Sequence, residues 1–74
     1  MRVLFLNNEG AGFADYVEVE PGTTVKTFFA QQLPGRHTHD FLIRVNRLPS
    51  AADQVLQPGD RVSITPKNIE GAAR

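Results

Sequence analysis

The stretch PGTTVKTFFAQQLPG, Pro21 to Gly35, carries the clearest helical signal in the sequence. Its large apolar residues recur at helical spacing and form one stripe: Val25, Phe28, Phe29 and Leu33. Thr23 or Thr24 can cap the first turn through its hydroxyl, and Pro34 ends the helix because the residue before a proline avoids the helical region. We therefore expect a helix of about nine residues, which is too short to be stable alone and needs a sheet to lie on.

Two strand-like segments precede this helix. Residues 1–6 (MRVLFL) have apolar side chains on both faces, which favours a central strand, and residues 13–20 (FADYVEVE) alternate apolar and polar side chains. Candidate core residues in the second segment are Phe13, Val17 and Val19. Residues 7–12 (NNEGAG) are rich in Asn and Gly, which adopt positive φ at little cost, so the two strands are expected to form a hairpin.

Two more strands are expected after the helix. Residues 41–46 (FLIRVN) and 61–65 (RVSIT) alternate along the chain, with Val62 and Ile64 pointing inward. Residues 36–40 (RHTHD) read as a polar connection. Residues 48–57 read as irregular, with a short turn of helix or strand near Gln54–Leu56.

The order of these elements predicts an α+β fold in one small domain. One amphipathic helix has to cover one face of a mixed sheet of roughly four or five strands, and the crossover lets the first and last strands pair in parallel at its centre. This is the β-grasp arrangement. The expected core is Val3, Phe5, Val17, Val19, Val25, Phe28, Phe29, Leu33, Phe41, Ile43, Val45, Val62 and Ile64.

Composition narrows the classes of function. The 74 residues include eight basic and eight acidic side chains and no cysteine, so neither a nucleic-acid partner nor a thiolate chemistry is indicated. A chain this short leaves little room for a deep substrate cavity, and no nucleophile motif is present, so we expect a non-enzymatic protein without a cofactor. The apolar runs are too short for a membrane span or a signal peptide, and we expect a cytoplasmic monomer.

The second half of the chain carries a family resemblance. Val45 to Pro66 follow the pattern VN-x-x-P…L-x-x-GD-x-V-x-I-x-P, and PGTTVKTFF stands at the helix start. In this order and length they resemble the small sulfur-carrier proteins, namely the thiamine-pathway carrier and the small subunit of molybdopterin synthase. These belong to the ubiquitin-like β-grasp group, and the resemblance covers essentially the whole length.

The resemblance implies that the C-terminal end carries the chemistry. Residues 1–66 would form the β-grasp domain, and residues 67–74 a flexible tail whose carboxylate is activated by an adenylating partner enzyme. Such tails end in Gly-Gly, whereas this one ends Gly71-Ala72-Ala73-Arg74 after Glu70. Three alternatives are open: a protease exposes Gly71 or Ala72, Ala72 replaces the second glycine, or only protein binding remains. Glu70 could pair with a basic groove on the activating enzyme.

A second candidate site is the sheet face opposite the helix. Strand alternation places apolar and basic side chains on it, and the expected members are Arg2, Leu4, Leu6, Tyr16, Leu42 and Arg44, with Ser63 and Thr65. Exposed apolar clusters on a small protein often mark an interface, and Tyr and Arg are enriched at binding hot spots. Partial cover by loops, or separation by strand twist, is the alternative reading.

His37-Thr38-His39-Asp40 suggests a metal site only weakly, because a site needs three or four converging ligands and the sequence has no other histidine. A polar loop is the preferred interpretation, and no metal is expected. The favoured function is a sulfur-carrier-like or ubiquitin-like modifier. The alternative is a non-covalent interaction module that uses the open sheet face.

Overall fold

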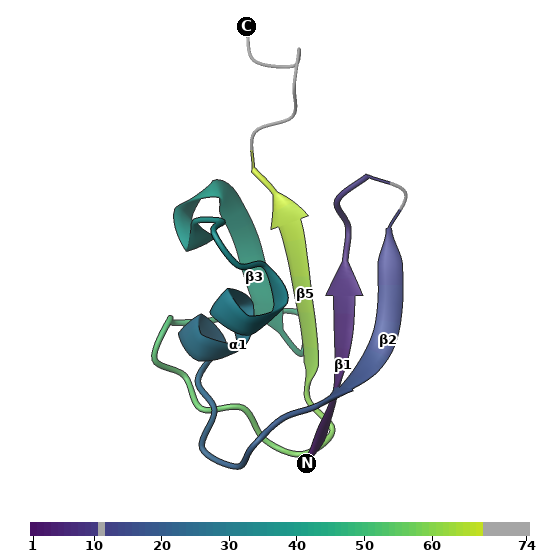
Figure 1. Ribbon diagram of the computed structural model, residues 1–74, viewed down its shortest axis with the longest axis vertical. Helices are drawn as coiled ribbons and strands as arrows, with labels where there is room; N and C mark the ends of the chain where they lie inside the picture. The colour runs from purple at the N-terminus through teal and green to yellow at the C-terminus, as the bar shows by residue number, and fades with distance from the viewer. Residues whose placement is uncertain (11, 68–74) are drawn as a thin grey trace, which may run out of the picture.

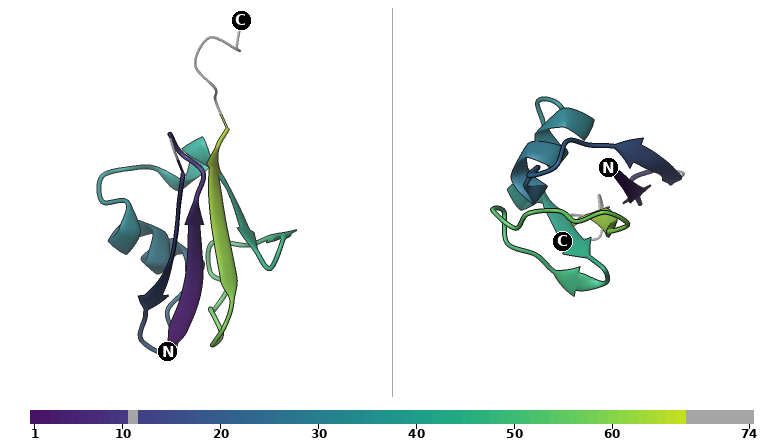
Figure 2. Two further views of the ribbon diagram at one scale, coloured as in Figure 1. Left: turned by 90° about the vertical axis from the view of Figure 1, so that its right-hand side faces the viewer. Right: turned by 90° about the horizontal axis from the view of Figure 1, so that it is seen from below.

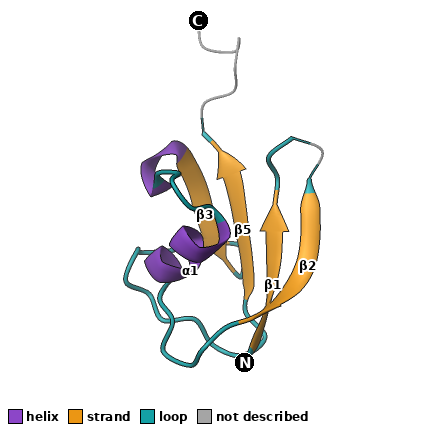
Figure 3. Ribbon diagram, viewed as in Figure 1, coloured by secondary structure: helices purple, strands orange, loops and turns teal. Residues whose placement is uncertain are grey.

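The computed structural model describes residues 1–10 and 12–67. Within them lie five strands, one α-helix and one 3₁₀ turn (Figures 1 and 3). The elements in chain order are β1 (Arg2–Asn7), β2 (Phe13–Glu18), α1 (Val25–Gln32), η1 (Thr38–Asp40), β3 (Phe41–Val45), β4 (Leu48–Pro49) and β5 (Arg61–Pro66). The predicted α+β class is confirmed, with one helix on one face of a mixed sheet.

The described strands form one sheet in the order β2-β1-β5-β3-β4. β1 and β5 are parallel neighbours in its middle, with Phe5 beside Val62, and the other pairs are antiparallel. The parallel pairing of the first and last strands, expected from the crossover, is therefore confirmed. The sheet curves around α1, which lies against one face (Figure 2).

Helix α1 begins where the sequence indicates. The Thr24 hydroxyl accepts a hydrogen bond from the Thr27 amide at 3.2 Å, which makes Thr24 the N-cap. The helix ends before Pro34, and Gly35 then adopts a φ of 82°, a left-handed conformation that suits glycine. The helical stripe packs onto the sheet, as expected from its spacing, with Phe28 1% exposed.

The segment between β4 and β5 is tied to the start of α1. The carbonyls of Ala52 and Gln54 accept hydrogen bonds from the first two amides of the helix, both at 2.9 Å. Such amides have no partner inside a helix, so the segment supplies what the helix lacks. The Leu56 amide donates to the Thr23 carbonyl at 2.8 Å, and the Leu56 side chain is 1% exposed.

The core lies between α1 and the sheet. Its buried hydrophobic residues are Val3, Phe5, Val19, Val25, Phe28, Phe29, Phe41, Val45, Leu56, Val62 and Ile64. Leu56 is an addition to the expected set, because the sequence placed it in an irregular segment. Three expected members are only partly buried and pack against the core: Val17, Leu33 and Ile43.

The assignment of Phe13 to the core is wrong, since its side chain is 54% exposed. Phe13 does lie on the inner side of the hairpin, and its ring meets Phe5 edge-on with centroids 6.1 Å apart. An eight-residue helix is only about 12 Å long, which is too short to cover the far end of the hairpin as well.

Residues 48–57 were expected to be irregular apart from a short turn of helix or strand near Gln54–Leu56, and β4 corrects this at Leu48–Pro49. Asn46 and Arg47 have φ values of 52° and 74°, which are the two positive values that a two-residue hairpin turn of type I′ requires. Without a glycine this turn leaves little trace in the sequence. It returns the chain so that Leu48 pairs with Val45.

Candidate functional site

The face of the sheet opposite α1 is the first candidate site. Val3 and Phe5 of β1 and Val62 and Ile64 of β5 are buried against the helix, so the residues between them point the other way. With the strand register, this alternation defines the open sheet face: Arg2, Leu4, Leu6, Ala14, Tyr16, Glu18, Leu42, Arg44, Arg61, Ser63 and Thr65.

The register places the expected interface residues on this face but not in one cluster. Leu4 lies beside Tyr16 on β2 and Arg61 on β5, while Leu42 lies on β3 beside Thr65. Because β5 separates β1 from β3 and neighbouring strands are about 4.8 Å apart, Leu4 and Leu42 are at least about 10 Å apart. The leucines are half-buried, and whether the face is an interface stays a prediction.

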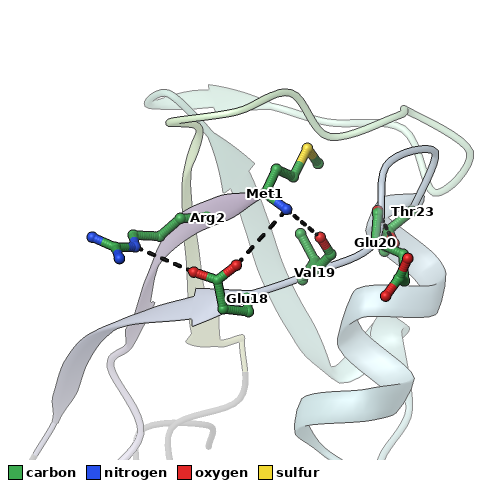
Figure 4. Close-up of polar contacts among 6 residues, drawn as sticks. All are labelled: Met1, Arg2, Glu18, Val19, Glu20 and Thr23. Carbon is green, nitrogen blue, oxygen red and sulfur yellow. Dashed lines mark hydrogen bonds and ion pairs between the residues drawn. The ribbon is translucent and has the colours of Figure 1, made fainter.

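Arg2 is already engaged within the protein. Its Nε lies 3.3 Å from Glu18 Oε2 (Figure 4). Its guanidinium carbon lies 5.6 Å from the centre of the Tyr16 ring. The Met1 ammonium donates to the Val19 carbonyl at 2.8 Å, which holds the start of β1 against the same hairpin. Tyr16 itself is 60% exposed. Tyr16 and Arg2, whose side chain is 66% exposed, are thus both accessible at this end of the face.

The face also contains a group of basic residues of which the sequence analysis named only Arg44. Arg44, Arg47 and Arg61 surround a shallow hollow of about 560 Å³ together with Leu6. Within residues 1–10 and 12–67, none of the three arginines lies within ion-pairing distance of a carboxylate. We name these four residues the arginine hollow.

The arginine hollow has a simple chemical meaning. Guanidinium groups around a leucine side chain suit a partner that offers carboxylates beside an apolar residue. Strand alternation already placed Arg61 outward, so the sequence alone could have assigned Arg61 to the interface residues. Arg47 could not, because its place depends on the positive-φ turn after β3.

The His37–Asp40 segment forms η1 and its approach. The two imidazole rings stack with centroids 5.3 Å apart, and His39 Nε2 lies 3.5 Å from Asp40 Oδ1. In the described part of the chain, no group of three or more His, Asp or Glu side chains is arranged to hold a metal ion.

The C-terminal candidates Glu70, Gly71 and Ala72 lie outside the described residues. The last described residue, Lys67, directly follows β5, and its amide donates to the Asp40 carbonyl at 3.0 Å. The proposed domain limit at residue 66 coincides with the end of β5 but stays a prediction. No helix in residues 1–10 and 12–67 has the length and apolarity to span a membrane.

The similarity of this chain to known proteins is one of fold. Neither a family model nor a curated protein matches the sequence. Among solved structures, a ubiquitin-like protein from the hyperthermophilic archaeon Caldiarchaeum subterraneum is similar over 93% of this chain and 99% of that one, with a TM-score of 0.60 and 18% identity. At this identity the likeness shows the fold, which is ubiquitin-like. The narrower resemblance to sulfur carriers stays a prediction.

Proposed function

We propose that this protein is a small ubiquitin-like modifier, which docks an adenylating enzyme through the open sheet face and presents its C-terminal end to that enzyme. The observation that carries the proposal is the path of β5. Its outward residues Arg61, Ser63 and Thr65 belong to the open sheet face, and the strand leads at once to Lys67 and the C-terminal segment. A partner seated on this face would therefore lie beside the start of that segment.

The chemistry requires a carboxylate and a partner that brings ATP. A carboxylate oxygen at the C-terminus attacks the α-phosphorus of ATP, pyrophosphate leaves, and an acyl-adenylate remains. An amine or hydrosulfide then attacks the acyl carbon, AMP leaves, and an amide or thiocarboxylate results. Small residues such as Gly71 and Ala72 suit the narrow site that this attack requires, because they have little or no side chain.

A second candidate function is non-covalent binding through the same face. It is favoured by the absence of any Gly-Gly pair from the sequence. The arginine hollow supports binding in either case, because among residues 1–10 and 12–67 no carboxylate pairs with its three guanidinium groups, which favours an acidic partner. The two candidates therefore differ in the fate of the C-terminal carboxylate and share the docking surface.

Exchange of radiolabelled pyrophosphate into ATP tests the modifier role. The probe is the adenylating enzyme fraction of the source cell, to which the full chain is added. We expect exchange to rise on addition of the wild-type chain, and to fall about tenfold with Arg61→Glu combined with Tyr16→Ala, because both docking groups are lost. Lys26→Glu, which changes the charge on α1 by the same amount, is the matched control and should leave exchange unchanged.

The outcomes separate the two candidates. Exchange that depends on the chain and on Arg61 supports the modifier. Failure of the chain to raise exchange, together with retained binding of an acidic partner at Arg61, supports the non-covalent module. Exchange that is insensitive to both substitutions contradicts docking through the open sheet face.

A further inference from the structure

The arginine hollow concentrates positive charge that the described residues do not neutralise. Of the five arginines that the structure describes, Arg2 and Arg36 form ion pairs with glutamates, and the other three all line the hollow. Asp60, which precedes Arg61 in the chain, directs its carboxylate to the Asn46 side chain and a turn amide instead. The guanidinium groups of the hollow are therefore available to an anion from outside the described chain.

Strand pairing places the members of the hollow close together. β1, β5 and β3 are adjacent in the sheet (Figure 1), and Leu6, Ser63 and Arg44 form one row across them. Arg61 lies two residues before Ser63 on β5, which makes it a diagonal neighbour of Arg44, at roughly 7–8 Å between the two Cα atoms. The long side chains of both arginines can therefore reach the space above Ser63.

Arg47 and the Ser63 hydroxyl add further donors. Arg47 enters from the positive-φ turn after β3, next to Asn46, whose amide donates to a β5 carbonyl at 2.7 Å and so holds the turn beside that strand. The Thr65 hydroxyl accepts from Asn8 Nδ2 at 3.0 Å, whereas the Ser63 hydroxyl, which also lines the hollow, has no hydrogen-bond partner among the described residues. Three guanidinium groups and one hydroxyl are thus left for a ligand.

This set of donors suits a phosphate better than a single carboxylate. A guanidinium group presents a fork of N–H donors, and a carboxylate meets such forks with two oxygens and one negative charge. A phosphate monoester has three terminal oxygens and a charge of about −2 at neutral pH, so it engages more of the donors. It also offsets the mutual repulsion of Arg44 and Arg61, which lie close together.

The surroundings of the hollow favour a phosphate carried by a protein segment over one carried by a nucleotide. Among the described residues that line it, Leu6 is apolar but none has an aromatic ring on which a base could stack. Leu4 and the 60% exposed Tyr16 continue the same face from there. Apolar residues next to the phosphate in a protein segment would therefore meet apolar surface.

We propose that the arginine hollow binds a phosphoserine side chain of a partner protein, with an apolar residue on each side of it. The three guanidinium groups bind the phosphate oxygens, the Ser63 hydroxyl donates to one of them, and Leu6 contacts a flanking apolar side chain. Phosphorylation of the partner then controls docking, because an unmodified serine carries no charge. Such docking rests on the open sheet face of the proposed function, but it does not require adenylation of the C-terminus.

The probe is a capped peptide of sequence Gly-Leu-Ser-Leu-Gly, phosphorylated at its serine, titrated into the isotope-labelled full chain and followed by amide and arginine side-chain NMR. Two matched peptides carry unmodified serine or glutamate at the same place. We expect the phosphopeptide to shift the Ser63 amide and the side-chain signals of the three arginines. It should bind about tenfold more tightly than the glutamate peptide, because it offers more charge and one more oxygen.

Charge variants with a matched control locate the site. Arg44→Gln with Arg61→Gln removes two positive charges from the hollow and should weaken binding of the phosphopeptide about tenfold or more. Lys26→Gln with Lys67→Gln removes the same charge from positions outside the hollow and should leave binding unchanged. Dispersed amide spectra check that each variant is folded. Inorganic phosphate, titrated alone, should bind more weakly than the phosphopeptide, because it lacks the flanking apolar contacts.

Four results would overturn the proposal: no binding at millimolar phosphopeptide, equal binding of the glutamate peptide, equal binding of inorganic phosphate, or equal effects of the two double variants. None of these titrations contains the adenylating enzyme. Failure of the phosphopeptide to bind while the chain still raises pyrophosphate exchange would therefore contradict the phosphoserine site alone. Binding of the phosphopeptide without any rise in exchange would support the site and contradict the modifier role.

Discussion

Asn46 and Asp60 are joined by a hydrogen bond from Asn46 Nδ2 to Asp60 Oδ1, 2.9 Å long. The same carboxylate accepts from the Gln57 amide at 2.8 Å, and Asn46 Oδ1 accepts from the Arg61 amide at 3.0 Å. These bonds tie the β3–β4 turn to the turn that precedes β5. The VN and GD elements of the sequence pattern thus have a structural explanation, because each contributes one partner.

Replacing Asp60 with alanine should lower the free energy of unfolding by about 1–3 kcal/mol, since the Asn46 side chain and the Gln57 amide both lose an acceptor. Urea titration followed by circular dichroism measures the change. Asp53→Ala is the control, because Asp53 is exposed and has no hydrogen bond through its side chain to another described residue. Equal stability of the two variants would show that the Asn46–Asp60 link is unimportant.

Leu56→Ala should lower the free energy of unfolding further, by about 2–5 kcal/mol, because it leaves a cavity in the core that the surrounding side chains cannot easily fill. A domain of this size has a total stability of roughly 3–5 kcal/mol, so much of the variant should be unfolded at room temperature. Thermal unfolding of Leu56→Ala and of Val55→Ala, whose side chain is 44% exposed, provides the comparison. A small effect at Leu56 would contradict its place in the core.

These two positions show what the sequence could and could not predict. Alternation and helical spacing are local, and they correctly placed residues such as Phe28 and Val62 in the core. Leu56 lies in a stretch with no period, and its burial depends on the distant Thr23 carbonyl. Phe13 had the right period, but α1 is too short to reach it.

The candidate site likewise has parts that the sequence predicts and parts that it does not. Alternation gave the open sheet face, because side chains on a strand change sides at every residue. The arginine hollow was missed because Arg47 enters it from a turn that lacks glycine. The sequence also gave no sign of the pocket lined by Phe41 of β3, Thr38 of η1 and Val25 of α1, because these elements approach each other only in the folded chain.

The positive φ of 74° at Arg47 leads to a stabilising substitution. Arg47→Gly should raise the free energy of unfolding by up to about 1 kcal/mol, because glycine adopts this conformation without steric cost, although it also gains freedom in the unfolded chain. Arg47→Ala removes the same charge and keeps the strain, so it separates the two effects in urea titration. A gain in both variants would attribute the effect to charge rather than to the backbone.

The helix cap is open to an equally direct check. Thr24→Ala should lower the free energy of unfolding by about 1 kcal/mol, because the Thr27 amide loses its acceptor. Thr24→Ser keeps a hydroxyl at the same place and should retain most of the stability. Thermal melts of the three proteins measure the order, and a Ser variant as weak as the Ala variant would assign the loss to packing instead.

The most direct measurement on the proposed function is the intact mass of the protein isolated from its native cells, with fragmentation of the C-terminal end. The modifier role requires a chain cut after Gly71 or Ala72, a terminal carboxylate in which sulfur replaces one oxygen, or a C-terminus joined to an amine. A chain that carries a free, unaltered Arg74 carboxylate in every molecule would contradict it and would leave non-covalent docking on the open sheet face.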